Sequence, residues 1–206
     1  MNANLKKEPV FLKVCVILSL LGFIGMFVAN VVGGMMVPNY DSVADTISDL
    51  GAGQHAIIQD VGFHAYAMSL IAIAVGLAHV HQGGYKWTAG IFTLVITSVL
   101  VLLIGGRNEY GDGDNSGVVL HTYFVYGLAL MVLITPLLLS AGLAKWDGVY
   151  QKFAWIFSGL WLITAPIFFF LPTNIDGLYE RGLGLLMTAW LLTLSFGLWQ
   201  QAKQTP

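Results

Sequence analysis

The sequence predicts an all-helical membrane protein in which about six transmembrane helices form a single domain over residues 1–206. Its composition is 57% hydrophobic and only 10% charged, whereas soluble proteins are about half apolar and about a quarter charged. The mean hydropathy is +0.76. Six apolar runs are each near or above the roughly 20 residues that a spanning helix needs. These runs lie at 11–37, 62–82, 87–105, 118–144, 153–171 and 182–200.

The first run follows a basic segment that contains Lys6 and Lys7. This arrangement is similar to the start of a signal peptide, but the apolar run is too long and lacks a small-residue cleavage site. We therefore expect a retained first helix. The only cysteine, Cys15, lies inside this run, which excludes a disulfide framework and a thiolate metal cluster.

A polar stretch from Asn39 to His64 separates the first two runs and holds four of the eleven acidic residues and two of the five histidines. Within it, Ser42-Val-Ala-Asp45 matches an S-x-x-D capping box, which is typical of a helix start. Gly51 is a typical helix end. We therefore expect a short amphipathic helix in this first outer loop.

Three acids, Asp41, Asp45 and Asp49, recur every four residues along that expected helix. Like charges at this spacing repel by roughly a few tenths of a kcal/mol per pair, so a cation or an arginine is an expected partner. The alternative is a helix whose acids face water, since surface charges need no partner. A second i, i+4 pair, Asp60 and His64, stands at the start of the next apolar run.

The distribution of basic residues predicts the orientation, because Lys and Arg near helix ends are retained in the cytoplasm. With the N-terminus inside, seven of the nine basic residues fall on the inner side and nine of the eleven acids on the outer side. We therefore expect both termini in the cytoplasm and the protein in a bacterial inner membrane. The short inner loops hold no nucleotide-binding loop and no basic patch for nucleic acid, and membrane lipids are the expected partners.

Ionisable side chains stand near the outer ends of the second, fourth and sixth apolar runs. They are His64, His121, and the adjacent pair Glu180 and Arg181. Ionisable groups inside a membrane are costly and mark a functional site by default. We therefore expect these groups to share one outward-facing polar pocket.

A glycine-rich acidic loop, RNEYGDGDNSG, precedes His121 and carries Arg107, Asp112 and Asp114. Asp112-x-Asp114 is similar to the opening of a calcium-binding loop, but no acid stands where the bidentate ligand should follow. So many Gly, Asn and Asp residues are typical of a turn. We expect a turn that brings its charged side chains to the outer pocket.

Three short motifs carry a resemblance to a known family. They are Ser48-Asp49-Leu50-Gly51 within DTISDLG, His121 at the start of the fourth run, and Glu180-Arg181 within GLYERGLGLLMTAW. With these motifs the chain resembles the bacterial six-helix membrane proteins grouped as domain-of-unknown-function family 998. The resemblance covers nearly the whole chain and implies a fold and a topology rather than a reaction. The acidic loop at 106–117 departs from the family pattern.

One function class that fits these residues is a hydrolase acting on a lipid or lipid-linked substrate at the outer leaflet. A divalent metal held by Asp60, His64 and His121 would activate water. The expected catalytic residues are Ser48, Asp49, Glu180 and Arg181, and the expected binding residues are Asp41, Asp45, Arg107, Asp112 and Asp114. Such a metal site requires its ligands to converge within about 2 to 2.5 Å of one point.

Two other function classes stay open. One is electron transfer, with His64 and His121 as the axial ligands of a b-type haem; it is less favoured, because such bundles usually carry several histidine pairs. The other is a non-catalytic binding, sensing or scaffold protein with a structural salt-bridge network of Asp49, Glu180, Arg107 and Arg181. The sequence therefore leaves open whether the protein is an enzyme.

Overall fold

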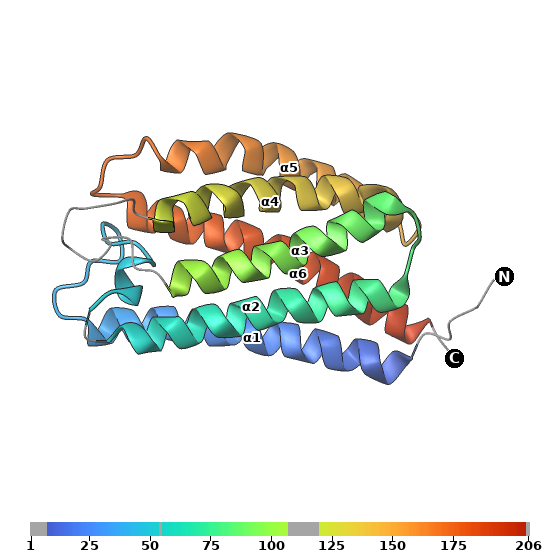
Figure 1. The fold of residues 1–206 in the computed structure, drawn as a ribbon, viewed down its shortest axis with the longest axis horizontal. Helices are drawn as coiled ribbons and strands as arrows, with labels where there is room; N and C mark the ends of the chain where they lie inside the picture. The colour runs from blue at the N-terminus through green and yellow to red at the C-terminus, as the bar shows by residue number, and fades with distance from the viewer. Residues whose placement is uncertain (1–7, 54, 107–119, 205–206) are drawn as a thin grey trace.

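A computed structural model describes residues 8–53, 55–106 and 120–204 of the chain. Within these ranges the secondary structure is entirely helical, and six long helices lie side by side in one bundle (Figure 1). The helices are α1 (Pro9–Met36), α2 (Ala56–Val80), α3 (Tyr85–Gly105), α4 (Leu120–Leu143), α5 (Gly148–Phe168) and α6 (Asp176–Lys203). A single 3-10 turn, η1 (Asp49–Gly51), lies between α1 and α2.

All six predicted helices are present, but three of them start five or six residues earlier than hydropathy indicates. Helix α2 begins at Ala56 rather than at 62, α5 at Gly148 rather than at 153, and α6 at Asp176 rather than at 182. Polar or charged residues near these starts interrupt the hydropathy pattern, among them Asp60 in α2 and Asp176 in α6. Glu180 and Arg181 lie within the first two turns of α6.

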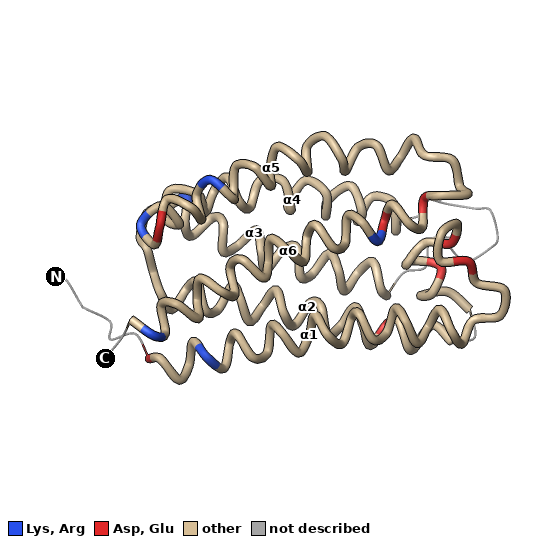
Figure 2. The backbone as a smooth tube through the Cα atoms, turned by 180° about the vertical axis from the view of Figure 1, so that it is seen from behind, with Lys and Arg blue, Asp and Glu red and all other residues tan. Residues whose placement is uncertain are grey.

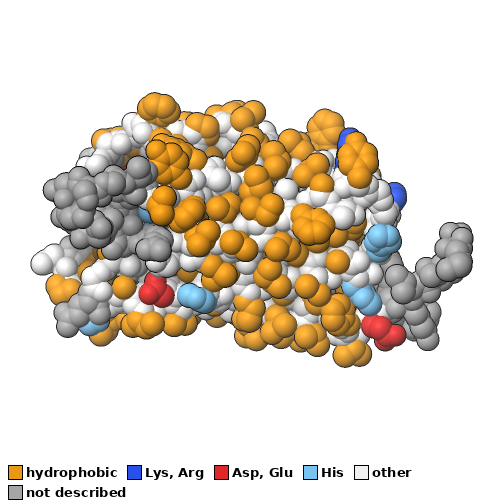
Figure 3. Space-filling model, viewed as in Figure 1, with side chains coloured by type: hydrophobic (Ala, Val, Ile, Leu, Met, Phe, Trp, Pro, Cys, Tyr) orange, Lys and Arg blue, Asp and Glu red, His pale blue; other side chains and the backbone are white. Residues whose placement is uncertain are grey.

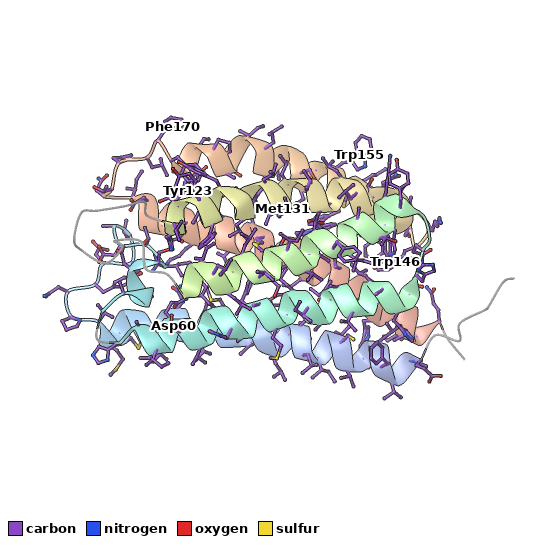
Figure 4. All side chains as sticks on the ribbon, viewed as in Figure 1. Asp60, Tyr123, Met131, Trp146, Trp155 and Phe170 are labelled. Carbon is purple, nitrogen blue, oxygen red and sulfur yellow. The ribbon has the colours of Figure 1, made fainter. Side chains whose placement is uncertain are left out.

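The surface of the bundle is that of a membrane protein. Five of the six helices are long and apolar enough to span a membrane, α5 being the exception among the described helices. Large apolar side chains cover the flank of the molecule in Figure 3. On α5 as well, Trp155 is 60% exposed, and Figure 4 shows it pointing away from the bundle. The chain is therefore a multi-pass membrane protein.

Charged residues gather at the two ends of the bundle (Figure 2). One end, here called the terminal end, holds the start of α1 and the end of α6, together with all the described lysines. The other end, the cap end, holds most of the described acids and Arg181. This is the segregation that the sequence predicts.

Small hydroxyl side chains join three helices near the middle of the bundle. Ser19 of α1 lies 2.9 Å from Ser195 of α6, measured between the two Oγ atoms. Ser69 of α2 donates to the carbonyl oxygen of Ser19 at 3.0 Å. Small polar residues allow membrane helices to approach closely while their hydroxyl groups stay hydrogen-bonded. These contacts hold α1, α2 and α6 together below the cap end.

The segment 37–53, here called the cap, differs from the amphipathic helix that Ser42 and Gly51 predict. Its only helical turn among the described residues is η1, and the preceding residues form turns. The capping box is displaced: Thr46 Oγ1 accepts from the Asp49 amide at 3.1 Å, and the Asp49 carboxylate accepts from the Thr46 amide at 2.6 Å. This T-x-x-D box starts a helical turn four residues later than the S-x-x-D box would.

Candidate functional site

The cap lies directly on the start of α6. The Leu178 amide donates to the Val43 carbonyl oxygen at 2.9 Å, which satisfies one of the backbone donors that a helix start leaves free. At Gly177, a Cβ atom would stand only 2.1 Å from the Asp45 carbonyl oxygen. The backbones therefore meet more closely than any other residue type would allow at this position.

Arg181 holds the cap in place from α6. Its Nη1 donates to the carbonyl oxygens of Ser42 at 3.0 Å, Asp45 at 2.9 Å and Gly177 at 2.8 Å. Its Nη2 donates to the hydroxyl group of Tyr40, and the guanidinium carbon lies 5.5 Å from the centre of the Tyr40 ring. A guanidinium group with this many partners on one segment positions that segment. Arg181 is therefore a positioning residue for the cap.

Tyr40 continues this network into the cap itself. Its hydroxyl group donates to the Thr46 carbonyl oxygen at 2.7 Å. Burial raises the pKa of Tyr40 from 10.0 to about 12, although the hydrogen bond from Arg181 acts in the opposite direction. The phenol is therefore neutral and able to donate at physiological pH.

Glu180 reaches the cap from the other side of the same helix turn. Its Oε2 accepts from the Ile47 amide at 2.5 Å. Among the residues that the structure describes, this is the hydrogen bond that the carboxylate accepts.

Ser48 and His121 form a second pair below the cap. The Ser48 hydroxyl oxygen lies 3.1 Å from His121 Nε2, and the two residues are only 7% and 5% exposed. A serine hydroxyl group within hydrogen-bond reach of an imidazole is the arrangement of an activated nucleophile. The structure thus joins a residue of the DTISDLG motif to the histidine that opens α4.

A cavity of about 390 Å³ lies beneath the cap at the cap end of the bundle, and residues of all six helices line it. Its wall is mostly apolar, with side chains that include Phe23, Phe63, Val101, Leu128, Trp161 and Met187. Its polar wall residues are Asn30, Tyr66, Glu180, Arg181 and Thr188. A mostly apolar cavity of this size with a few polar groups is typical of a small-molecule site.

The aspartates of the cap stabilise its own turns. Asp45 Oδ2 accepts from the Asp41 amide at 2.7 Å, and Asp41 Oδ1 accepts from the Val43 amide at 2.9 Å. The Asp49 carboxylate accepts from both the amide and the hydroxyl group of Thr46. Because the expected helix is absent here, the three acids do not form a stripe on one helix face. A binding role for Asp41 and Asp45 stays a prediction.

The expected metal site of Asp60, His64 and His121 is not assembled. His64 is exposed on α2, and its Nδ1 donates to the Asp60 carbonyl oxygen at 2.7 Å. His121 is buried against Ser48. Across residues 8–53, 55–106 and 120–204, no three His, Cys, Asp or Glu side chains form a group that could hold a metal ion. Haem ligation by His64 and His121 stays a prediction.

Asp60 itself lies on α2 towards the cap end (Figure 4). Its Oδ1 is buried and without a hydrogen bond. Arg107, Asp112 and Asp114 lie outside the described residues, so the salt-bridge network that includes Arg107 stays a prediction. Of the expected catalytic residues, the structure brings Ser48, Asp49, Glu180 and Arg181 together around the cap.

Four site residues were missed by sequence analysis. Asn30, Tyr66 and Thr188 line the cavity, and Tyr40 accepts a hydrogen bond from Arg181. Of these residues, Asn30 could have been identified from the sequence, because it is the only amide side chain in the first apolar run. Tyr66 and Thr188 are compatible with any membrane helix, and only the packing shows that their hydroxyl groups lie 3.1 Å apart.

Comparison with known protein families gives a match over most of the chain. The family model described as "Protein of unknown function (DUF998)" covers residues 16–197. Comparison with curated proteins and with solved structures found no match. The matched region runs from the first turns of α1 to near the end of α6 and includes the cap and the cavity.

Proposed function

The chain belongs to the DUF998 family, and on that premise we propose that it binds the apolar chain of a lipid or lipid-linked molecule in the cavity beneath its cap. The protein would lie in the bacterial cytoplasmic membrane with both termini inside, because the described lysines all lie at the terminal end and Lys and Arg favour the cytoplasmic side. The cap and the cavity then belong to the outer leaflet.

The single observation that supports this proposal most is the cavity of about 390 Å³. Protein interiors are close-packed and contain few voids larger than a water molecule. A space of this size among apolar helices is therefore expected to have an occupant, and its mostly apolar wall favours an alkyl or prenyl chain over a polar solute.

The wall of the cavity also reaches the surface that faces lipid. Phe27 of α1 and Leu185 of α6 both line the cavity, yet they are 65% and 66% exposed. Side chains that border both the cavity and the outer surface mark an opening on the flank of the bundle. A chain from the surrounding bilayer could enter there without crossing the polar cap.

Hydrolysis of the bound molecule is a second candidate function, favoured by the Ser48–His121 pair. In this reaction Ser48 Oγ would attack an ester carbonyl carbon while His121 Nε2 accepts the hydroxyl proton. The ester C–O bond would then break, His121 would return the proton to the departing alcohol, and water would hydrolyse the acyl-serine to the free acid and Ser48. Ile47 lines the cavity, and Ser48 is the next residue along the cap. The test is ester hydrolysis by the purified protein: Ser48→Ala must abolish it, and hydrolysis that persists in this variant would reject the pair as its nucleophile and base.

The binding proposal is tested by filling the cavity from within. A Cβ atom at Gly184, which lines the cavity, meets nothing within 4 Å, and the same holds at Gly182, which is not part of the wall. Gly184→Leu therefore places a side chain in the cavity, and Gly182→Leu is a matched control on the same helix. Leucine is also a better helix former than glycine, so neither variant should unfold.

The readout is native mass spectrometry of the protein extracted from membranes in mild detergent. We expect the parent protein and Gly182→Leu to retain a lipid adduct and Gly184→Leu to lose it. Equal retention by both variants, or no retained lipid and no binding of added lipid by the parent protein, would reject the proposal.

A further inference from the structure

The polar groups at the end of the cavity differ in how many of their hydrogen-bond donors and acceptors already have a partner within the protein. Arg181 is the only basic residue of the wall, and anionic head groups are usually held by such a residue. Here Nη1 already donates to three carbonyl oxygens and Nη2 to Tyr40. Most donors of the guanidinium group are therefore already engaged within the protein.

Glu180 is in the opposite situation. Oε2 is engaged with the Ile47 amide, and among the described residues this is the hydrogen bond that the structure shows for the carboxylate, which leaves Oε1 for a ligand. A carboxylate removed from water is costly unless hydrogen bonds compensate the loss. Glu180 lines the cavity, so a ligand that donates a hydrogen bond there would provide this compensation.

The cavity wall contains other hydrogen-bond acceptors. Thr188 donates its only hydroxyl hydrogen to the Gly184 carbonyl oxygen at 2.8 Å. In the 3.1 Å contact between the two hydroxyl groups, Tyr66 must therefore be the donor, which leaves the Tyr66 oxygen as an acceptor only. The wall thus offers acceptors at Glu180 and Tyr66, and most donors of its one cation already bond to the cap. Asn30, also on the wall, carries an amide that can accept as well as donate.

We infer that the molecule bound in this cavity carries a hydrogen-bond donor, a hydroxyl or an ammonium group, that reaches Glu180 Oε1, and that molecules with an anionic end are disfavoured. This inference rests on the proposed function and specifies its ligand class: an apolar chain with a neutral or cationic donor at its end. An anionic end would meet the Glu180 carboxylate at short range, where like charges repel strongly in a low dielectric.

The test uses three probes of one chain length that differ only in their end group: an alcohol, a primary amine and a carboxylate. Each probe carries bromine on its chain, because bromine quenches tryptophan fluorescence on contact and Trp161 lines the cavity. Quenching that disappears in Trp161→Phe reports binding inside the cavity. Titration in detergent at pH 9, where carboxyl groups are ionised and a primary amine is still protonated, then gives a dissociation constant for each probe.

We expect the alcohol and the amine to bind at least about tenfold more tightly than the carboxylate, which corresponds to about 1.4 kcal/mol. In Glu180→Gln, whose amide oxygen can still accept from the Ile47 amide, this preference should shrink to within about twofold. A carboxylate probe that binds as tightly as the others, or a preference that Glu180→Gln leaves unchanged, would overturn the inference.

The outcomes separate the two levels of the proposal. If the three probes quench Trp161 equally, the cavity binds chains and only the inference about the end group fails. If no probe quenches Trp161, or if Gly184→Leu binds all of them as the parent protein does, the proposed function itself fails. The three end groups are compared on the parent protein, which needs no variant at position 180. This comparison therefore decides the inference even if Glu180→Gln folds poorly.

Discussion

The two ends of the bundle use their side chains in opposite ways. At the terminal end, Trp87 is 2% exposed and packs edge-on against Trp146 at 5.9 Å between ring centres. Its indole N–H donates to the Leu77 carbonyl oxygen at 3.2 Å. Large aromatic side chains therefore fill the space between the helices there, and the pocket at that end, about 200 Å³, is the smaller of the two.

At the cap end the helices are tied together by polar contacts, and the space between them is left open. Arg181, Glu180 and the Leu178 amide all bond to the cap, and a cavity of about 390 Å³ remains beneath it. From this difference we infer that side-chain packing at the terminal end stabilises the fold. At the cap end, hydrogen bonds hold the helices and the cap together around an open cavity. Changes at the two ends should therefore have different effects.

The largest expected effect is at the terminal end. Trp87→Ala removes a buried indole, and truncation of a buried tryptophan costs about 3–5 kcal/mol. We expect global destabilisation, seen as a large fall in the thermal unfolding midpoint in detergent. Trp155→Ala, at a 60% exposed position on α5, is the matched control and should change stability little. Similar losses in both variants would mean that packing at the terminal end is not what stabilises the bundle.

At the cap end, Gly177→Ala is expected to cost about 2–4 kcal/mol, because a new Cβ atom would stand 2.1 Å from the Asp45 carbonyl oxygen and force two backbones apart. The loss should be local, so limited proteolysis should cleave the cap faster while the helices stay protected. Gly182→Ala, where a Cβ atom meets nothing within 4 Å, should be neutral or stabilising by up to about 1 kcal/mol. A protease-resistant cap in Gly177→Ala would contradict the contact.

A smaller effect is expected for Arg181→Lys. Lysine keeps the charge but cannot reproduce the planar group that serves Tyr40 and three carbonyl oxygens. Hydrogen bonds to charged groups are worth about 1.5–3 kcal/mol, and we expect a loss in that range together with a loosened cap. Hydrogen exchange of the 40–47 amides measures it. Unchanged exchange in Arg181→Lys would show that only the charge of this residue matters.

The smallest expected effect concerns Tyr40 and pH. The pKa of Tyr40 is raised from 10.0 to about 12 in the folded protein. A raised folded-state pKa stabilises the fold fully below pH 10, and this contribution is lost as the pH rises towards 12. We expect exchange of the cap amides to accelerate more steeply across this window in the parent protein than in Tyr40→Phe. Identical pH profiles for the two proteins would exclude Tyr40 as the titrating group.

Sequence analysis predicted the helices and the sorting of charges because both follow from hydropathy and from residue counts near helix ends. The cap was predicted less well, because Ser42-x-x-Asp45 and Thr46-x-x-Asp49 are competing boxes and only the contacts with α6 select the second. The place of His64 near the start of the second helix was predicted, but the face of α2 that carries it was not. Apolar residues recur on every side of α2, so its sequence does not identify an inner face.

The cavity could not be predicted, because it is the space that six separate helices leave unfilled. Glu180 and Arg181 were recognised as site residues from their charge alone. Their different roles depend on which cap groups they reach: the Ile47 amide for Glu180 and several carbonyl oxygens for Arg181. No local pattern contains that information.

The most direct test of the central claim is a crystal structure grown in a lipid mesophase that contains a long-chain alcohol brominated on its chain. Anomalous scattering then locates the bromine without ambiguity. The account predicts a bromine peak inside the cavity, among Phe23, Trp161 and Met187, in the parent protein and no such peak in Gly184→Leu. Peaks confined to the outer surface, or a cavity closed by inward movement of the helices, would contradict it.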